Sequence, residues 1–231
     1  MKKLALSTAI TAVLSTSLFI NPAFADKDRD EMMVYHVTIT NTTTNHILTP
    51  PIIVAHGKGF HLFRLGDSMH PASEGLATLA ETGNPAVLVD EVSGDPKVSK
   101  AMAGSALVFA GEPSMMYEII APKGTMFSVA SMLASTNDAF TAAVNIKAPK
   151  KGRHTHAMGL TYDAGSEKNN EDCAYIPGPP CGNDMQKNEP GEGFVTVHSG
   201  IHGIADLPAA KYDWRGATSM ISIHNAGKYS N

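Results

Sequence analysis

Apolar and polar residues alternate with a period of two in several short segments of this chain. In the clearest of them, Tyr35, Val37 and Ile39 are separated by polar residues, which is the pattern of a strand with one buried face. Similar runs predict strands at residues 33–40, 51–55, 105–109, 115–121, 126–133, 140–146, 193–197 and 218–224. The pattern therefore predicts a protein of the all-β class.

Two segments between the predicted strands have helical spacing, at residues 71–81 and 84–91. In the second, Asn84 is the predicted N-cap and Pro85 stands in the first turn, while Val87 and Leu88 begin an apolar side. Two short helices do not make a helical layer. Residues 168–192 are rich in Asn, Pro, Gly and charge, which predicts one long surface loop.

The first 25 residues have the pattern of a secretory signal peptide. Lys2 and Lys3 precede an apolar stretch that ends in Ala23-Phe24-Ala25, so cleavage is expected after Ala25. Repeated Ser and Thr residues interrupt the apolar stretch and disfavour a retained membrane anchor, and no later segment is long and apolar enough to be transmembrane. We therefore expect a single domain of residues 26–231, exported to the periplasm or the extracellular space.

Export changes the interpretation of the two cysteines and of the net charge. Cys173 and Cys181 flank a Pro-rich segment, and an oxidising compartment favours a disulfide bond that contributes about 2–3 kcal/mol. The alternative is a free thiol pair that ligates copper or zinc. Without Lys2 and Lys3 the formal charge falls from −4 to −6, which disfavours nucleic acid as a partner.

Three carboxylates lie in two turn-like segments that follow apolar runs. Asp138 belongs to SMLASTNDAF at residues 131–140, and Asp163 and Glu167 belong to TYDAGSE at residues 161–167. Calcium takes several oxygen ligands in irregular geometry, so carboxylates from separate loops could hold one ion. The alternative is that these are ordinary turn residues, since Asp bonds its own backbone in turns and no EF-hand motif is present.

Both segments resemble the two signature stretches of the spondin N-terminal domain family, whose eukaryotic members read roughly S-P-S-P-D-W and W-D-A-G-T-D. Residues 135–140, STNDAF, are similar to the first, and residues 163–167, DAGSE, to the second. The chain departs from the pattern at Ala139 and Tyr162, where those members carry Trp, and at Glu167, where they carry Asp. The resemblance covers residues 34–223.

The resemblance implies an antiparallel β-sandwich that binds one calcium ion through Asp138, Asp163 and Glu167. It further implies a recognition or cell-adhesion module whose partners are cell-surface or extracellular macromolecules, either protein or glycan. Such a module is not an enzyme. Binding would act by ordering, because calcium neutralises carboxylates whose mutual repulsion otherwise loosens the loops.

Histidine and methionine are abundant and give an alternative. All ten His and eleven of the twelve Met lie after residue 25. His154 and His156 are spaced to share one face of a strand, and His198 and His202 flank a turn. Imidazole and thioether ligands suit copper or zinc, so the alternative function is a periplasmic soft-metal binder. A further His and Met cluster at residues 56–70 suggests a metal-binding or partner-binding loop, or more simply the start of a buried strand.

Catalysis has little support in the sequence. The Gly-x-Ser-x-Gly, His-Glu-x-x-His and phosphate-loop motifs are absent. A carbohydrate-binding or glycoside-cleaving protein would use Asp163 as one of a carboxylate pair. The only Trp is Trp214, however, so aromatic platforms for sugars are few.

Overall fold

The computed structural model describes residues 31–183, 186–188 and 190–230. The predicted signal peptide, residues 1–25, lies outside them. No helix in these three segments is long and apolar enough to cross a membrane.

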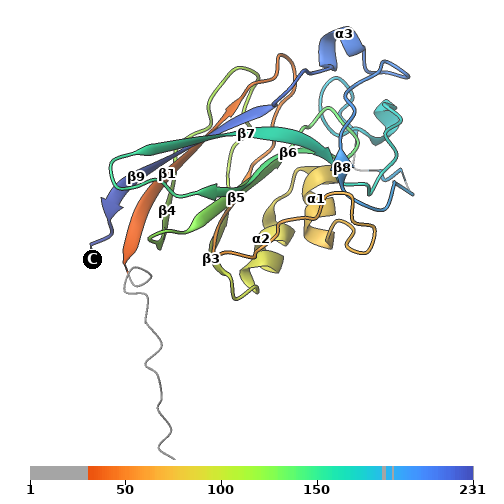
Figure 1. Cartoon of the computed structure of the whole chain (residues 1–231). Coiled ribbons are helices and arrows are strands. Elements are labelled where there is room, and N and C mark those ends of the chain that lie inside the picture. Colours follow the sequence, from red (N-terminus) through yellow and green to blue (C-terminus); the bar gives the residue numbers. More distant parts are fainter. Residues whose placement is uncertain (1–30, 184–185, 189, 231) are drawn as a thin grey trace, which may run out of the picture.

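Antiparallel strands make up most of the described chain, as predicted (Figure 1). They are β1 (Met32–Asn41), β2 (Ile52–His56), β3 (Val98–Ala103), β4 (Tyr117–Pro122), β5 (Met126–Met132), β6 (Ala139–Lys147), β7 (His154–Asp163), β8 (Thr196–Val197) and β9 (Ser219–Lys228). Their order in the sheet is β3-β2-β5-β6-β7-β9-β1-β4, and β8 pairs with β7. The predicted all-β antiparallel class is therefore confirmed.

The sheet folds over so that its two halves enclose an apolar core. Tyr35, Val37 and Ile39 of β1 are buried, as their alternation predicts, and they pack with apolar residues of β4 and β9 and of β2, β5 and β6. Tyr35 meets Phe127 of β5 edge to face, with ring centroids 5.1 Å apart. This core thus joins strands from both halves of the sheet.

Strand β7 belongs to both halves. Its residues from His154 to Gly159 pair with β9, and its later residues up to Asp163 pair with β6. A Cβ at Gly159 would lie 2.1 Å from Oγ of Ser219, so only glycine allows the close approach at this changeover. The changeover carries the far end of β7 to the start of β6, where the candidate site lies.

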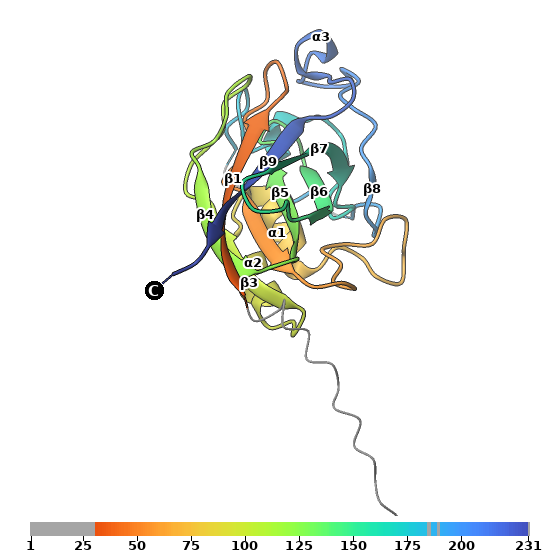
Figure 2. The ribbon, with the colours of Figure 1, turned by 60° about the vertical axis from the view of Figure 1, so that its left-hand side comes forward.

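Helices α1 (Glu74–Thr82) and α2 (Ala86–Ser93) cover the outer face of one half of the sheet (Figures 1 and 2). Both begin later than predicted. Ser73 caps α1 through its Oγ, which accepts the N–H of Leu76. Pro85, not Asn84, occupies the N-cap of α2, although Oδ1 of Asn84 accepts the N–H of Ala86. Pro85 has helical dihedral angles, which places the helix start one residue beyond Asn84.

Four strand assignments from the sequence need correction. Residues 105–109 form no strand and only Val108 is buried, in an isolated bridge to Leu48. Strand β3 was missed because it is partly exposed and carries polar residues at the edge of the sheet. Strand β7 was missed beyond its His154-x-His156 start, and the predicted strand at 193–197 shortens to the two residues of β8.

The loops after β7 gather at one end of the molecule, near the helix α3 (Ala209–Tyr212) (Figure 1). They include the predicted long loop, whose only regular element in the described part is the short 3-10 helix η1 (Cys173–Tyr175). The predicted disulfide bond between Cys173 and Cys181 is present. It closes a short ring in this loop, so the thiol alternative is excluded in this structure.

Candidate metal centre

Asp138 and Asp163 are brought together by the pairing of two neighbouring strands. Asp138 precedes β6 and Asp163 ends β7, and in the antiparallel register Ala139 stands opposite Asp163. The carbonyl of Asp138 accepts the N–H of Ala164 at 3.2 Å. Two sequence segments about 25 residues apart therefore meet at one edge.

Asp138 is fully buried and only one of its carboxylate oxygens has a partner. Its Oδ2 accepts the N–H groups of Ser166 and Glu167, at 2.8 and 2.9 Å, and the hydroxyl of Ser166. Its Oδ1 is buried without a hydrogen-bond partner. Burial, together with the negative charge of Asp163, raises the pKa of Asp138 to about 7. The site thus holds a carboxylate that needs either a proton or a cation.

Asp163 is also buried, but both of its oxygens are hydrogen-bonded. Oδ1 accepts the N–H of Gly165 at 2.6 Å, and Oδ2 accepts the side-chain amide of Asn169. Burial raises the pKa of Asp163 to about 6, although the Gly165 N–H favours the charged form. Gly165 has a positive φ of 70° and lies against the backbone of Phe194, so a side chain here would break the turn.

Glu167 is buried four residues beyond Asp163. Its backbone N–H binds Asp138, while its carboxylate accepts the N–H of Asn188 at 2.9 Å. In segments 31–183, 186–188 and 190–230, no three His, Cys, Asp or Glu side chains converge closely enough to surround one cation. The structure therefore brings Asp138 and Asp163 together and places Glu167 beside them, with its side chain engaged elsewhere.

Two of the three residues at which the chain departs from the spondin pattern, Ala139 and Tyr162, are part of the apolar packing. Ala139 is fully buried in the main core. Tyr162 packs against Phe63 and Phe140, with centroid distances of 4.8 and 5.6 Å. An aromatic residue is thus kept at one of the two positions, next to Asp163.

A chain of hydrogen bonds connects Asp163 to a buried histidine. Asn169 donates its amide to Asp163, and its Oδ1 accepts from Nε2 of His198 at 3.0 Å. Nδ1 of His198 accepts the N–H of Gly200, which fixes the neutral tautomer. Burial lowers the pKa of His198 to about 4. This role of Asn169 is not visible in the sequence, because nothing there distinguishes it from other polar residues of the long loop.

Glu171 is a further buried carboxylate, and the sequence did not single it out. Its two oxygens accept the N–H groups of His202, Gly203 and Ile204 at 2.6, 2.7 and 2.9 Å. Its backbone has a positive φ of 57°. Glu171 therefore ties the long loop to the segment that also carries His198.

The predicted His pairs differ in their surroundings. His154 and His156 are exposed on one face of β7 with their rings 6.2 Å apart. Both ring nitrogens of His198 are occupied, and Nε2 of His202 lies 2.9 Å from Oγ of Ser199. Both imidazoles of the first pair are therefore exposed, whereas His198 of the second pair has no free ring nitrogen.

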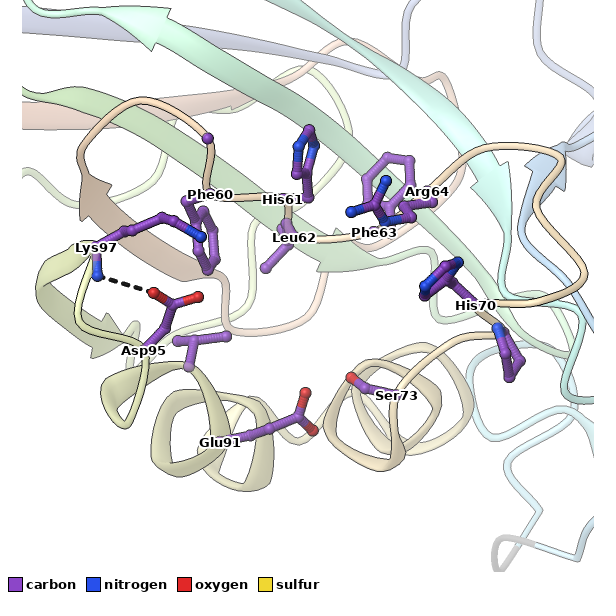
Figure 3. Close-up of a pocket in the computed structure, with 13 residues that line it drawn as sticks. Phe60, His61, Leu62, Phe63, Arg64, His70, Ser73, Glu91, Asp95 and Lys97 are labelled. Carbon is purple, nitrogen blue, oxygen red and sulfur yellow. Dashed lines mark hydrogen bonds between the residues drawn. The ribbon is translucent and has the colours of Figure 1, made fainter.

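From the cluster at residues 56–70, residues 59–64 and His70 line a groove of about 320 Å³ beside α1 and α2 (Figure 3). His56 is buried and binds Ser128, so the strand-start interpretation holds for it. In Figure 3, Glu91 points from α2 into the groove, below Leu62. Glu91 also accepts the N–H of Gly75, which fixes its position. The groove carries charges of both signs but is not part of the carboxylate site.

No family model matches this chain, and no curated protein is significantly similar to it. The assignment to the spondin N-terminal domain family stays a prediction from the two short motifs.

Proposed function

We propose that this protein is an exported, non-catalytic recognition or adhesion module that binds one calcium ion at Asp138 and Asp163, with Glu167 beside them. The observation that carries the proposal is the unpartnered Oδ1 of Asp138, buried next to a second carboxylate. A buried ionised pair is costly unless a cation compensates it. Calcium supplies that charge and tolerates irregular oxygen geometry.

The ligand set would combine carboxylate oxygens with neutral ones. Calcium takes about six to eight oxygens, and backbone carbonyls and waters complete sites that few carboxylates begin. Glu167 would have to release the N–H of Asn188 to reach the ion. Loss of that bond is a local change in the long loop.

Calcium binding would affect recognition by ordering the loops that follow β7. Asp138 already holds the backbone at Ser166 and Glu167, and Asp163 holds Gly165 and Asn169. Neutralising both carboxylates would strengthen this turn and, through Asn169 and His198, the loops at the α3 end (Figure 1). These loops would present the surface that binds a cell-surface or extracellular protein or glycan.

Two features support export to the periplasm or beyond. The disulfide bond between Cys173 and Cys181 persists in oxidising compartments. Residues 1–25 have the signal-peptide pattern. The mild negative charge agrees with a partner other than nucleic acid.

Calcium is expected to raise the melting temperature of the chelated, oxidised protein by about 5–10 °C at 100 times its Kd. Binding at that excess adds about 2.7 kcal/mol, and each kcal/mol shifts the melting temperature of a domain of this size by roughly 2–4 °C. Asp163→Asn should abolish the shift. Differential scanning calorimetry with added calcium, magnesium, zinc or copper is the measurement.

The matched control is Asp90→Asn, which removes an exposed charge from α2. This variant should keep the full calcium shift. An equal shift in wild type and Asp163→Asn, or no shift with calcium in wild type, would overturn the proposed function.

A further inference from the structure

Three histidines stand in one row across the outer face of the sheet, far from the carboxylate site. In the strand register His36 of β1 is opposite His224 of β9, and His224 is opposite His154 of β7. Glu118 of β4 stands opposite His36 and extends the row. Strands β4, β1, β9 and β7 lie side by side in Figures 1 and 2. Sequence separation hides this row, because its three histidines are 70 or more residues apart along the chain.

The rings of this row are in contact. The centroids of His154 and His224 are 4.4 Å apart, and those of His36 and His224 are 5.8 Å apart. His156 stands two residues along the same face of β7, with its ring 6.2 Å from that of His154. Four imidazoles therefore form one continuous patch, which we call the histidine row.

These separations match those of imidazoles that share a metal ion. With a metal–nitrogen bond of about 2.0–2.1 Å, two rings on a tetrahedral ion have centroids about 5 Å apart. The ring of His154 is stacked against that of His224, at an interplanar angle of 19°, whereas the rings of His36 and His224 are tilted by 49°. In the described residues these rings do not surround one position, so convergence on one ion requires rotation about their side-chain torsions.

The neighbouring positions on this face also favour a soft or borderline metal. In the next row across the strands, Ser222 of β9 lies between Thr38 of β1 and His156 of β7. In the row after that, Met220 of β9 is opposite Met158 of β7. Met158 is 56% exposed. Imidazole and thioether ligands select copper and zinc over calcium and magnesium.

Glu118 gives the row an acidic end. Its Oε2 lies 3.4 Å from Nε2 of His36. A carboxylate bonded to a ligating imidazole orients the ring and raises its basicity. His36 thus has a partner of the kind that metal-binding histidines have.

We propose that His36, His154, His156 and His224 form a surface site for a divalent transition-metal ion, with copper(II) bound more tightly than zinc(II). The order of affinities follows the general preference of nitrogen ligands among these ions. The site is independent of the calcium site. Asp163 lies nine positions after His154 along β7, which corresponds to about 30 Å along a strand.

Titration of the untagged, chelated protein with copper(II) or zinc(II) tests the site. The wild type should bind one copper ion, and its electron paramagnetic resonance spectrum should show coupling to three or more nitrogens. The double variant His154→Ala/His224→Ala should bind copper more than about 100-fold more weakly, since loss of even an outer-shell partner costs roughly 10–100-fold.

Two controls make the result specific. His61→Ala/His70→Ala removes two exposed histidines from the groove beside α1 and should leave copper binding unchanged. Asp163→Asn should also leave it unchanged, while it abolishes the calcium response. Unchanged copper affinity and nitrogen coupling in His154→Ala/His224→Ala, or an equal loss in the groove variant, would overturn the proposal. The circular dichroism spectrum of each variant reports that the sheet is intact.

Discussion

Replacing Glu171 with Ala is expected to lower the free energy of unfolding by about 3 kcal/mol. The carboxylate accepts three backbone N–H groups from His202, Gly203 and Ile204. Hydrogen bonds to a charged group contribute about 1.5–3 kcal/mol each, and the exposure of the segment 202–204 reduces their sum. Urea unfolding at neutral pH measures the loss.

Two further variants identify the cause. Glu171→Gln keeps one carbonyl oxygen as an acceptor and should lose less stability than Glu171→Ala. Glu112→Ala removes an exposed glutamate and should change stability by less than about 0.5 kcal/mol. Equal stability of Glu171→Ala and Glu112→Ala would show that the three hydrogen bonds between Glu171 and the backbone of residues 202–204 do not stabilise the protein.

In the chelated protein, the contribution of Asp138 to the free energy of unfolding is expected to fall by about 2–3 kcal/mol between pH 5 and pH 8. The folded-state pKa of this carboxyl, about 7, lies above the ordinary value of 3.8. The folded state therefore binds the proton more tightly, so this contribution is complete below pH 4 and is lost as the pH rises through 7. Urea unfolding at a series of pH values measures it.

Below about pH 6.5, the buried histidines change the stability in the opposite direction to Asp138. Burial lowers the pKa of His46, His56 and His198, so their contribution falls as the pH falls. The difference in stability between wild type and Asp138→Asn isolates the carboxyl. That difference should change by about 2–3 kcal/mol between pH 5 and pH 8, and a constant difference would contradict the assignment. With saturating calcium, this change with pH should have the opposite sign, so that wild type gains stability relative to Asp138→Asn as the pH rises. The reason is that the ion binds the ionised carboxylates.

Some strands, and the proximity of Asp138 to Asp163, could be predicted from the sequence. The alternation of Tyr35, Val37 and Ile39 identified β1 because one face of that strand is buried in the core. Turn residues after apolar runs indicated Asp138 and Asp163, which antiparallel pairing of β6 and β7 then brings together. In both cases the residues are marked by the pattern of their own segment, either a buried strand face or a turn after an apolar run.

The remaining features depend on contacts between distant segments. Strand β3 is polar because it lies at an edge of the sheet, so its pattern resembles a loop. Glu171 has the sequence surroundings of a solvated residue, and only the fold brings the backbone of 202–204 to its carboxylate. The histidine row depends on the register of three strands, which no single segment specifies.

The most direct test of the calcium site is isothermal titration calorimetry of the chelated protein at pH 6.5, in two buffers of different ionisation enthalpy. We predict that one calcium ion binds per chain and that up to about one proton is released, since Asp138 must ionise as the ion binds. Asp138→Asn and Asp163→Asn should show no binding at the same concentrations. Absence of calcium binding in the wild type, or binding that survives both substitutions, would show that Asp138 and Asp163 do not form a calcium site.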